Sequence, residues 1–178
     1  TKPIPKSGFA DMQSLPEWGD RPIERNVNAE CGRHALNNVF GIEGMFQHTD
    51  MENAAEQFLN DTGMGAEERA EHIDPNTGWY SHSILARVLQ NVQEKNLCLI
   101  NRPVEPTDYE RMLEDSTLVG AIVNQPGPIG HWTAIVKHNE AIWHVDSHPP
   151  SHTHLNAQRF HTLICKYRHH VFFIKSET

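Results

Sequence analysis

Apolar residues recur with helical spacing in the first half of this chain and with strand spacing in the second half. The first helical stripe, which Gly41 would end, consists of Cys31, Ala35, Leu36, Val39 and Phe40. Further helices are predicted from about residue 50 to 59, capped by Asp50 or Thr49, then over 66–72, and over 82–93 after a cap at Ser81. Helices that precede strands, instead of alternating with them, predict an α+β fold with a mainly antiparallel sheet.

The second half contains the β runs. Strands are predicted over 97–101, 118–123, 132–137, 141–145 and 171–175, and short helices over 108–115 and 155–163. The segment 138–140 is short and polar, so it predicts a tight hairpin between the strands on either side.

Length and charge narrow the class of protein. The 178 residues suit one domain, since domains have roughly 100–200 residues. Residues 1–22 are rich in proline and predict an extended lead-in, with the catalytic domain expected over 23–178. The net charge of −8, from 15 basic and 23 acidic residues, argues against nucleic acid as a partner. We expect a monomer with no signal peptide and no membrane segment, because no apolar run approaches ~18 residues.

The three cysteines differ in their surroundings. Cys98 and Cys165 lie in apolar runs and are expected in the core, whereas Cys31 has small or polar neighbours and opens a helical pattern. So sparse a set, with no CxxC pair, argues against a disulfide framework and a thiolate zinc site, and it suits an intracellular, reducing setting. The unpaired N–H groups at a helix N-terminus favour a thiolate, which makes Cys31 a candidate nucleophile.

A histidine and an aspartate mark the two ends of the predicted hairpin. His131 precedes one strand and Asp146 follows its partner, so a turn at about residue 139 places them nearly opposite one another. A carboxylate there would orient the imidazole and favour its protonated form, which in turn favours a thiolate beside it. Spacing alone does not place Cys31 next to this pair, but the three residue types are those of a cysteine version of the serine triad.

Three segments resemble the Josephin family, the ataxin-3-like deubiquitinases. Residues 31–38, CGRHALNN, resemble its CxxHxLNN signature, residues 130–135 its HW strand, and residues 143–147 its segment ending in Asp-Ser or Asn-Ser. The order is that of the family, and the likeness spans roughly residues 24–175. It implies a papain-like cysteine peptidase fold, with the catalytic cysteine at a helix N-terminus packed on the sheet. It also implies hydrolysis of the bond after the C-terminal glycine of ubiquitin or polyubiquitin, without a cofactor or metal.

Carried over by position, the resemblance implies that Cys31 is the nucleophile, His131 the general base and acid, and Asp146 the residue that orients it. The family has a Gln five positions before the cysteine, which donates to the oxyanion. This sequence has Asn26 there, with Asn28 as a second candidate, and an asparagine carries the same amide on a shorter side chain. The Cys31 N–H is the expected second donor. The resemblance also makes Trp79, Tyr80 and His82 candidates for contact with ubiquitin.

Some residues have a competing interpretation. His34 lies one turn from Cys31 on the same helix and is expected to be structural, and Asn37 and Asn38 to bond loop backbone. Trp132 is expected either to shield the His–Asp pair and contact substrate or to fill the core, and Trp79 and Tyr80 either to meet a partner or to seat a helix. The histidines between 144 and 161 predict a solvated loop rather than a metal site, because prolines interrupt them.

The sequence therefore predicts a thiol-dependent deubiquitinase. Two alternatives stay open. One is a module that binds ubiquitin with weak or no turnover, which the change to Asn26 favours. The other is a cysteine peptidase acting on a ubiquitin-like protein or another peptide, whether inside its own cell or as an effector inside a host cell.

Overall fold

The computed structural model describes residues 16–26, 30–63, 65–74, 79–99, 105–127 and 130–176. Within these residues the main sheet has six strands in the order β3-β8-β4-β5-β6-β7, and every neighbouring pair is antiparallel. The strands are β3 (Lys95–Leu99), β4 (Leu118–Gln125), β5 (His131–His138), β6 (Ala141–Ser147), β7 (Pro150–Leu155) and β8 (Val171–Ser176). The predicted α+β class with an antiparallel sheet is confirmed.

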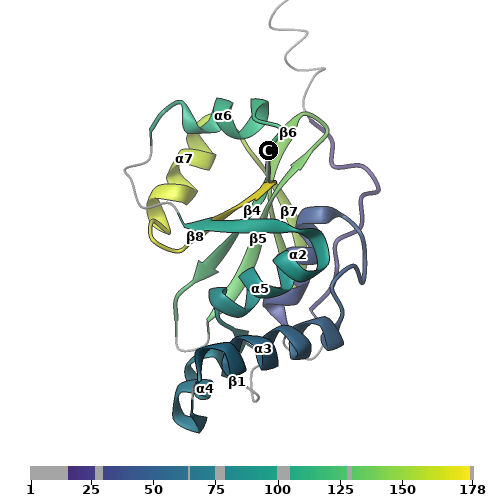
Figure 1. Ribbon diagram of the computed structural model, residues 1–178. Helices are drawn as coiled ribbons and strands as arrows, with labels where there is room; N and C mark the ends of the chain where they lie inside the picture. The colour runs from purple at the N-terminus through teal and green to yellow at the C-terminus, as the bar shows by residue number, and fades with distance from the viewer. Residues whose placement is uncertain are drawn as a thin grey trace, which may run out of the picture.

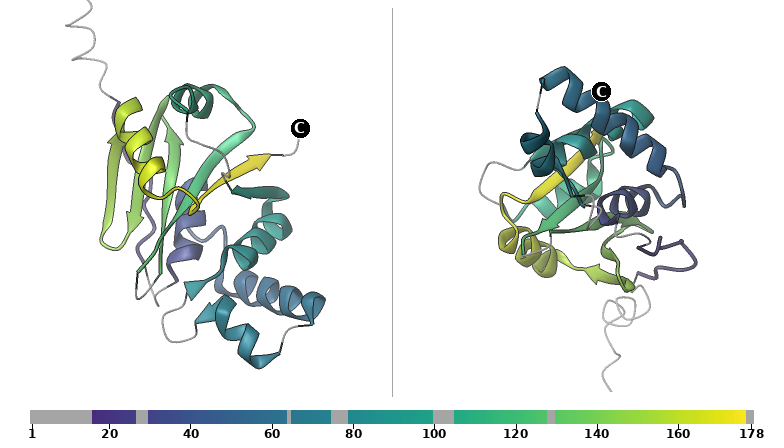
Figure 2. Two further views of the ribbon diagram at one scale, coloured as in Figure 1. Left: turned by 90° about the vertical axis from the view of Figure 1, so that its left-hand side faces the viewer. Right: turned by 90° about the horizontal axis from the view of Figure 1, so that it is seen from below.

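Helices cover both faces of this sheet (Figures 1 and 2). On one face lie α2 (Cys31–Phe40) and α5 (His82–Gln93), with α3 (His48–Thr62) packed on α5. The other face carries α6 (Asp108–Glu114) and α7 (Ala157–Lys166). Beyond α3, α4 (Ala66–His72) leads into a short ribbon of β1 (Ile73–Asp74) and β2 (Trp79–Tyr80), which the sequence analysis did not predict.

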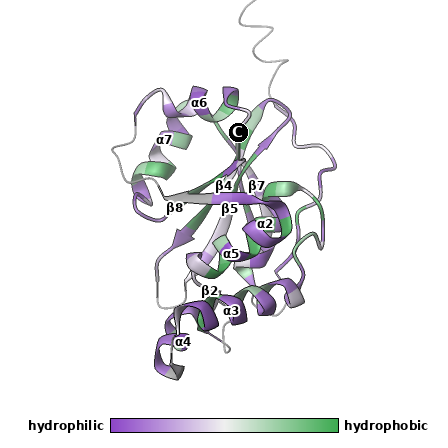
Figure 3. Cartoon of the chain, viewed as in Figure 1, coloured by the Kyte–Doolittle hydropathy of each residue, from purple (hydrophilic) through white to green (hydrophobic). Residues whose placement is uncertain are grey.

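Two hydrophobic cores follow from the alternation of side chains along the strands. Along β5, Trp132, Ala134 and Val136 face α2 and α5, while Ile135 faces α6 and α7. Because the central strands are buried on both faces, they read as nearly continuous apolar runs in the sequence. The outer helix α4 is largely hydrophilic (Figure 3). Among the described residues no helix has both the length and the apolar character to cross a bilayer.

Helix ends partly match the predictions. Gly41 ends α2 in the left-handed conformation, at φ 69°, as predicted. The predicted N-cap of α3, Thr49 or Asp50, was wrong by two or three residues. Gln47 is its N-cap and Asp50 is the third helical residue, whose carboxylate accepts the Gln47 N–H at 2.8 Å in a capping box. Ser81 precedes α5 as predicted, but its hydroxyl bonds the ring of His72 instead of capping the helix.

The histidine-rich segment is a strand, so its prediction as a solvated loop was wrong. Pro150 to Leu155 pair with β6 as the last strand of the sheet. An edge strand tolerates a proline at its first residue, because the missing N–H is not needed there. The helix that follows begins at Ala157, later than predicted, because the Asn156 side chain accepts the Arg159 N–H at 2.8 Å and caps it.

The described part of the proline-rich lead-in packs against the sheet. Trp18 is only 6% exposed, and its ring stacks on His152 with the centroids 5.0 Å apart. His138 bonds the Trp18 carbonyl at 2.7 Å. Further along, the Arg21 guanidinium donates to the carbonyls of Asn38 and Val39 at the end of α2. This segment therefore ties the β6–β7 edge to the helix that begins at Cys31.

Candidate active site

The β5–β6 hairpin brings His131 and Asp146 together. Its two loop residues, Asn139 and Glu140, have φ of 51° and 59°, which is the type I′ geometry that suits a two-residue turn. The register pairs Ala134 with Val145, so His131 and Asp146 lie on one face as diagonal neighbours. Their side chains meet with His131 Nε2 2.8 Å from Asp146 Oδ1. The proximity predicted from the hairpin is thus present in the structure.

Asp146 is held as a carboxylate. Burial alone would raise its pKa, but hydrogen bonds from His131 and from the His148 N–H, at 2.9 Å, hold the pKa below its usual value. An ionised Asp146 therefore fixes the orientation of the imidazole.

The Cys31 thiol lies at the first residue of α2, only 4% exposed. The backbone N–H of Trp132 donates to its Sγ at 3.5 Å, and the thiol lies near enough to the His131 ring to raise the pKa of that imidazole. Because Nε2 of His131 already meets Asp146, Nδ1 is the ring nitrogen left for Cys31. The helix start and β5 thus join the nucleophile candidate to the His–Asp pair, which spacing alone did not do.

His131 is strongly stabilised in its protonated form. Its hydrogen bond with Asp146 and, next, its contact with Cys31 raise its pKa from 6.5 to about 10, against the opposing effect of burial. A protonated imidazole beside a thiol stabilises the thiolate, and the Trp132 N–H adds a donor to the same sulfur. The arrangement can therefore hold a nucleophilic sulfur next to a proton donor.

A charged cluster that the sequence analysis missed lies beside the nucleophile. Glu30, which precedes Cys31, bonds Arg33 Nε at 2.5 Å and also the His48 ring, whose other nitrogen lies 2.8 Å from Glu52. The bond to Glu30 is the first cause of a raised His48 pKa. Arg33 and His48 thus balance the Glu30 carboxylate. The sequence signals for this cluster were the i, i+3 spacing of Glu30 and Arg33 and the i, i+4 spacing of His48 and Glu52.

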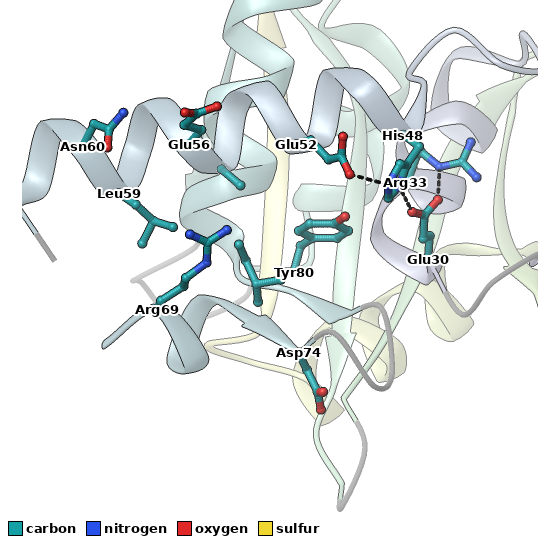
Figure 4. Close-up of a pocket in the computed structure, with 12 residues that line it drawn as sticks. Glu30, Arg33, His48, Glu52, Glu56, Leu59, Asn60, Arg69, Asp74 and Tyr80 are labelled. Carbon is teal, nitrogen blue, oxygen red and sulfur yellow. Dashed lines mark hydrogen bonds and ion pairs between the residues drawn. The ribbon is translucent and has the colours of Figure 1, made fainter. Parts of the chain in front are cut away.

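A cavity of about 770 Å³ opens from this cluster between α3, α4 and β2 (Figure 4). Its lining includes four carboxylates, from Glu30, Glu52, Glu56 and Asp74, together with the cations Arg33 and Arg69 and the ring of His48. The phenol of Tyr80 lies in the cavity, where burial and the charges of Glu30 and Glu52 raise its pKa to about 12. We call this the acidic cavity, and it begins at the residue adjacent to Cys31.

The polar residues along α2 anchor the neighbouring loops. His34 is 2% exposed, with Nδ1 2.5 Å from Glu24 Oε1, so it faces away from the thiol into a structural contact. Asn37 bonds both backbone groups of Phe46, at 2.7 and 3.1 Å, and Asn38 accepts the Glu24 N–H. This is the loop-backbone role expected for the two asparagines.

The four candidates for substrate contact occupy different environments. Trp132 is 1% exposed and donates through Nε1 to the Tyr80 carbonyl at 2.9 Å, so its ring lies in the core. His82 is exposed and stacks on Phe172, 5.0 Å between centroids. Trp79 packs against Gly130, where an added Cβ would lie 2.6 Å from the indole Nε1. That nitrogen is buried without a hydrogen-bond partner in the described structure. Trp79 therefore adjoins the residue before His131.

Asn26 lies near the end of β6. Its backbone N–H donates to the Ser147 carbonyl at 2.9 Å, one residue beyond Asp146. Its side-chain Oδ1 is buried without a partner among the described residues, and so is the Ser147 hydroxyl. Asn28 falls outside the described residues, as does part of the loop between Gly127 and Gly130.

No group of three or more potential metal ligands converges in the described part of the chain. The late histidines instead have separate contacts. His144 bonds Thr133 at 2.8 Å, His152 stacks on Trp18, and His161 lies 3.5 Å from the Cys165 sulfur on the exposed face of α7. Cys165 is exposed, so the prediction that it belongs to the core was wrong.

Comparison with known proteins gives a family. A search of curated proteins finds no match. The model of the Josephin family matches residues 27–175, nearly the whole chain of 178 residues. Josephin domains have the papain-like cysteine peptidase fold, and the family is one of thiol-protease deubiquitinases that bind ubiquitin. The match includes Cys31, His131 and Asp146, and on its extent the chain belongs to the Josephin family.

Proposed function

We propose that this protein is a thiol-dependent deubiquitinase that hydrolyses the peptide or isopeptide bond after the C-terminal glycine of ubiquitin. The observation that carries the proposal is the convergence of Asp146, His131 and Cys31. His131 Nε2 lies 2.8 Å from Asp146, and the Cys31 sulfur accepts the N–H of the next residue, Trp132, at 3.5 Å. Cys31 is the nucleophile, His131 the general acid and base, and Asp146 the residue that orients the imidazole. Membership of the family supports ubiquitin as the acyl side of the substrate.

The reaction follows from the two protonation states of His131. The Cys31 thiolate attacks the glycine carbonyl carbon, and a C–S bond forms as the C–N bond breaks. His131 gives its proton to the departing amine and then takes one from water, whose oxygen attacks the thioester. Breaking the C–S bond releases the carboxylate of ubiquitin and restores the thiolate beside a protonated imidazole.

The oxyanion of each tetrahedral intermediate needs donors of its own. We assign these to the backbone N–H of Cys31 and the carboxamide of Asn26. The hydrogen bond from the Asn26 N–H to the carbonyl of Ser147, one residue beyond Asp146, supports this assignment, in which the Nδ2 amide is the donor.

In this proposal, Tyr80 and the acidic cavity hold the acyl part of the substrate, which is ubiquitin. The cavity starts at Glu30, so a chain whose terminal carbonyl lies at Cys31 passes directly along it. Trp79 beside Gly130 forms a further wall near the base.

Ubiquitin with a C-terminal electrophile tests the proposal. The protein should form a covalent adduct, detected as a mass increase, and the adduct should vanish in Cys31→Ala but persist in Cys165→Ala. Hydrolysis of ubiquitin–aminomethylcoumarin should fall by about 10⁵–10⁶-fold in Cys31→Ala.

Two outcomes would replace the proposal. Binding of ubiquitin without an adduct would leave a ubiquitin-binding module, which the substitution of Asn26 for the family's Gln favours. An adduct with a ubiquitin-like protein but none with ubiquitin would indicate a peptidase of different specificity.

A further inference from the structure

A second cavity lies on the opposite face of the sheet from α2. It measures about 570 Å³ and is formed by α7 over the strands at the β4, β6 and β7 positions. Its lining residues are Gln125, His144, Leu155, Gln158, Arg159, Thr162, Leu163, Lys166 and Tyr167. None of these residues belongs to the candidate active site.

The cavity borders the His–Asp pair. Gln125 at one end is the register partner of His131 across β4 and β5, so the two side chains lie next to one another on the same face. His144 in its wall bonds Thr133 at 2.8 Å and lies two residues before Asp146 on that face. A row of side chains therefore leads from the pair into the cavity.

The charge of this cavity is opposite to that of the whole chain. The lining carries Arg159 and Lys166, and none of its described residues is acidic, although the protein has a net charge of −8. Both cations are exposed, and within the described part of the chain neither takes part in an ion pair. Burial lowers the pKa of His144, which keeps that ring neutral. The cavity thus presents positive charge and amide groups to a ligand.

The direction of the reaction decides which part of a substrate reaches this cavity. The acyl part is held on Cys31 and extends along the acidic cavity, whereas the amine leaves on the side of His131, which protonates it. The protein attached to that amine consequently lies on the face of the sheet that carries His131 and Asp146.

We infer that the cavity under α7 is a binding site for an acidic segment of the protein from which ubiquitin is removed, with Arg159 and Lys166 as its cationic contacts. This inference rests on the proposed function and adds specificity for the leaving-group side. If this site binds an acidic segment, the protein should prefer substrates with acidic sequence around the modified lysine.

Two isopeptide-linked substrates test the inference. One carries ubiquitin on the lysine of a peptide with flanking glutamates, and the other has glutamines in their place. The acidic substrate should have a kcat/KM about three- to tenfold higher at low salt, since exposed charge pairs interact weakly. The preference should fade as salt screens the charges. The double variant Arg159→Glu/Lys166→Glu should reverse it.

Matched controls separate this site from general electrostatics. Arg168→Glu changes an exposed cation outside the lining and should retain the preference. Ubiquitin–aminomethylcoumarin has no acidic segment, so the double variant should hydrolyse it at the unaltered rate. The inference would be overturned by equal kcat/KM for the two peptide substrates, or by a loss of the preference in Arg168→Glu as large as in the double variant. Hydrolysis of the coumarin substrate would still uphold the proposed function.

A binding measurement does not depend on turnover. Fluorescence anisotropy of the labelled, unconjugated peptides with Cys31→Ala should show tighter binding of the acidic peptide, by the same three- to tenfold, and tighter binding of the glutamine peptide when the double variant is combined with Cys31→Ala. The same affinity for both peptides would contradict the site even if the protein proved inactive on ubiquitin.

Discussion

The two halves of the candidate active site are built in different ways. His131 and Asp146 are 15 positions apart and belong to one hairpin, whose two-residue turn sets their register. Cys31 and Trp132 are 101 positions apart, and their contact depends on how α2 packs against β5. The base half is therefore fixed by local geometry, and the nucleophile half by the tertiary structure. Substitutions in the base half should mainly lower activity, and substitutions in the nucleophile half should mainly lower stability.

Asp146→Ala should give the largest effect in the base half. Loss of the carboxylate removes the main cause of the raised His131 pKa and frees the ring, so kcat/KM should fall by about 10²–10⁴-fold. The hairpin turn and its strands do not depend on this side chain, and the circular dichroism spectrum should be unchanged. Full activity would remove Asp146 from the site. In Asp146→Asn, the alkaline limb of the pH–rate profile should move to lower pH.

Asn26→Ala probes the boundary between the two halves. An oxyanion donor contributes about 10²–10³-fold to kcat, and that loss is expected with little change in KM. Asn26→Gln keeps the amide on the longer side chain of the family's Gln and serves as the matched control. An unchanged kcat in the alanine variant would assign the oxyanion to backbone donors alone.

Glu24→Gln should affect the nucleophile half mainly through stability. The Glu24 carboxylate accepts bonds from His34, Asn37 and the Gly44 N–H, so weakening them should lower the free energy of unfolding by about 1–3 kcal/mol. Urea denaturation measures the change. Glu67→Gln, on the exposed side of α4, should stay within about 0.5 kcal/mol of the parent. Equal effects of the two variants would argue against a supporting role for this network.

The last effect concerns the pH dependence of stability. The folded-state pKa of His131, about 10, lies above its ordinary value of 6.5, so its contribution is complete below pH 6.5 and is lost as the pH rises through 10. The pKa of Asp146 is lowered, so its contribution is present above its ordinary value of 3.8 and is lost as the pH falls. Urea midpoints measured across the alkaline range should decline less in Asp146→Asn. The same decline in both proteins would assign it to other groups.

The same contrast explains what the sequence could predict. The hairpin between 138 and 140 was predicted from its polar residues, and the pairing of His131 with Asp146 followed by counting residues. The position of Cys31 beside them came only from the resemblance, because the docking of α2 on β5 has no local signal. Charge spacing likewise gave no indication that Glu30 would meet His48, 18 positions away.

The largest error lay at the β6–β7 edge. Pro149 and Pro150 suggested a loop, because proline is excluded from the strands inside a sheet. An edge strand tolerates proline, and β7 is such a strand. The burial of Trp18 was missed for a related reason. Its partners, His138, Trp143 and His152, lie on strands more than a hundred positions later in the chain.

The span of 101 positions between Cys31 and Trp132 also bears on how the protein is made. Synthesis proceeds from the N-terminus, so the nucleophile leaves the ribosome long before β5 exists to hold it. Until then the thiol has neither the Trp132 N–H nor the protonated His131 beside it, and it is no more reactive than an ordinary cysteine. The order of the chain thus delays assembly of the candidate active site until the sheet has been made.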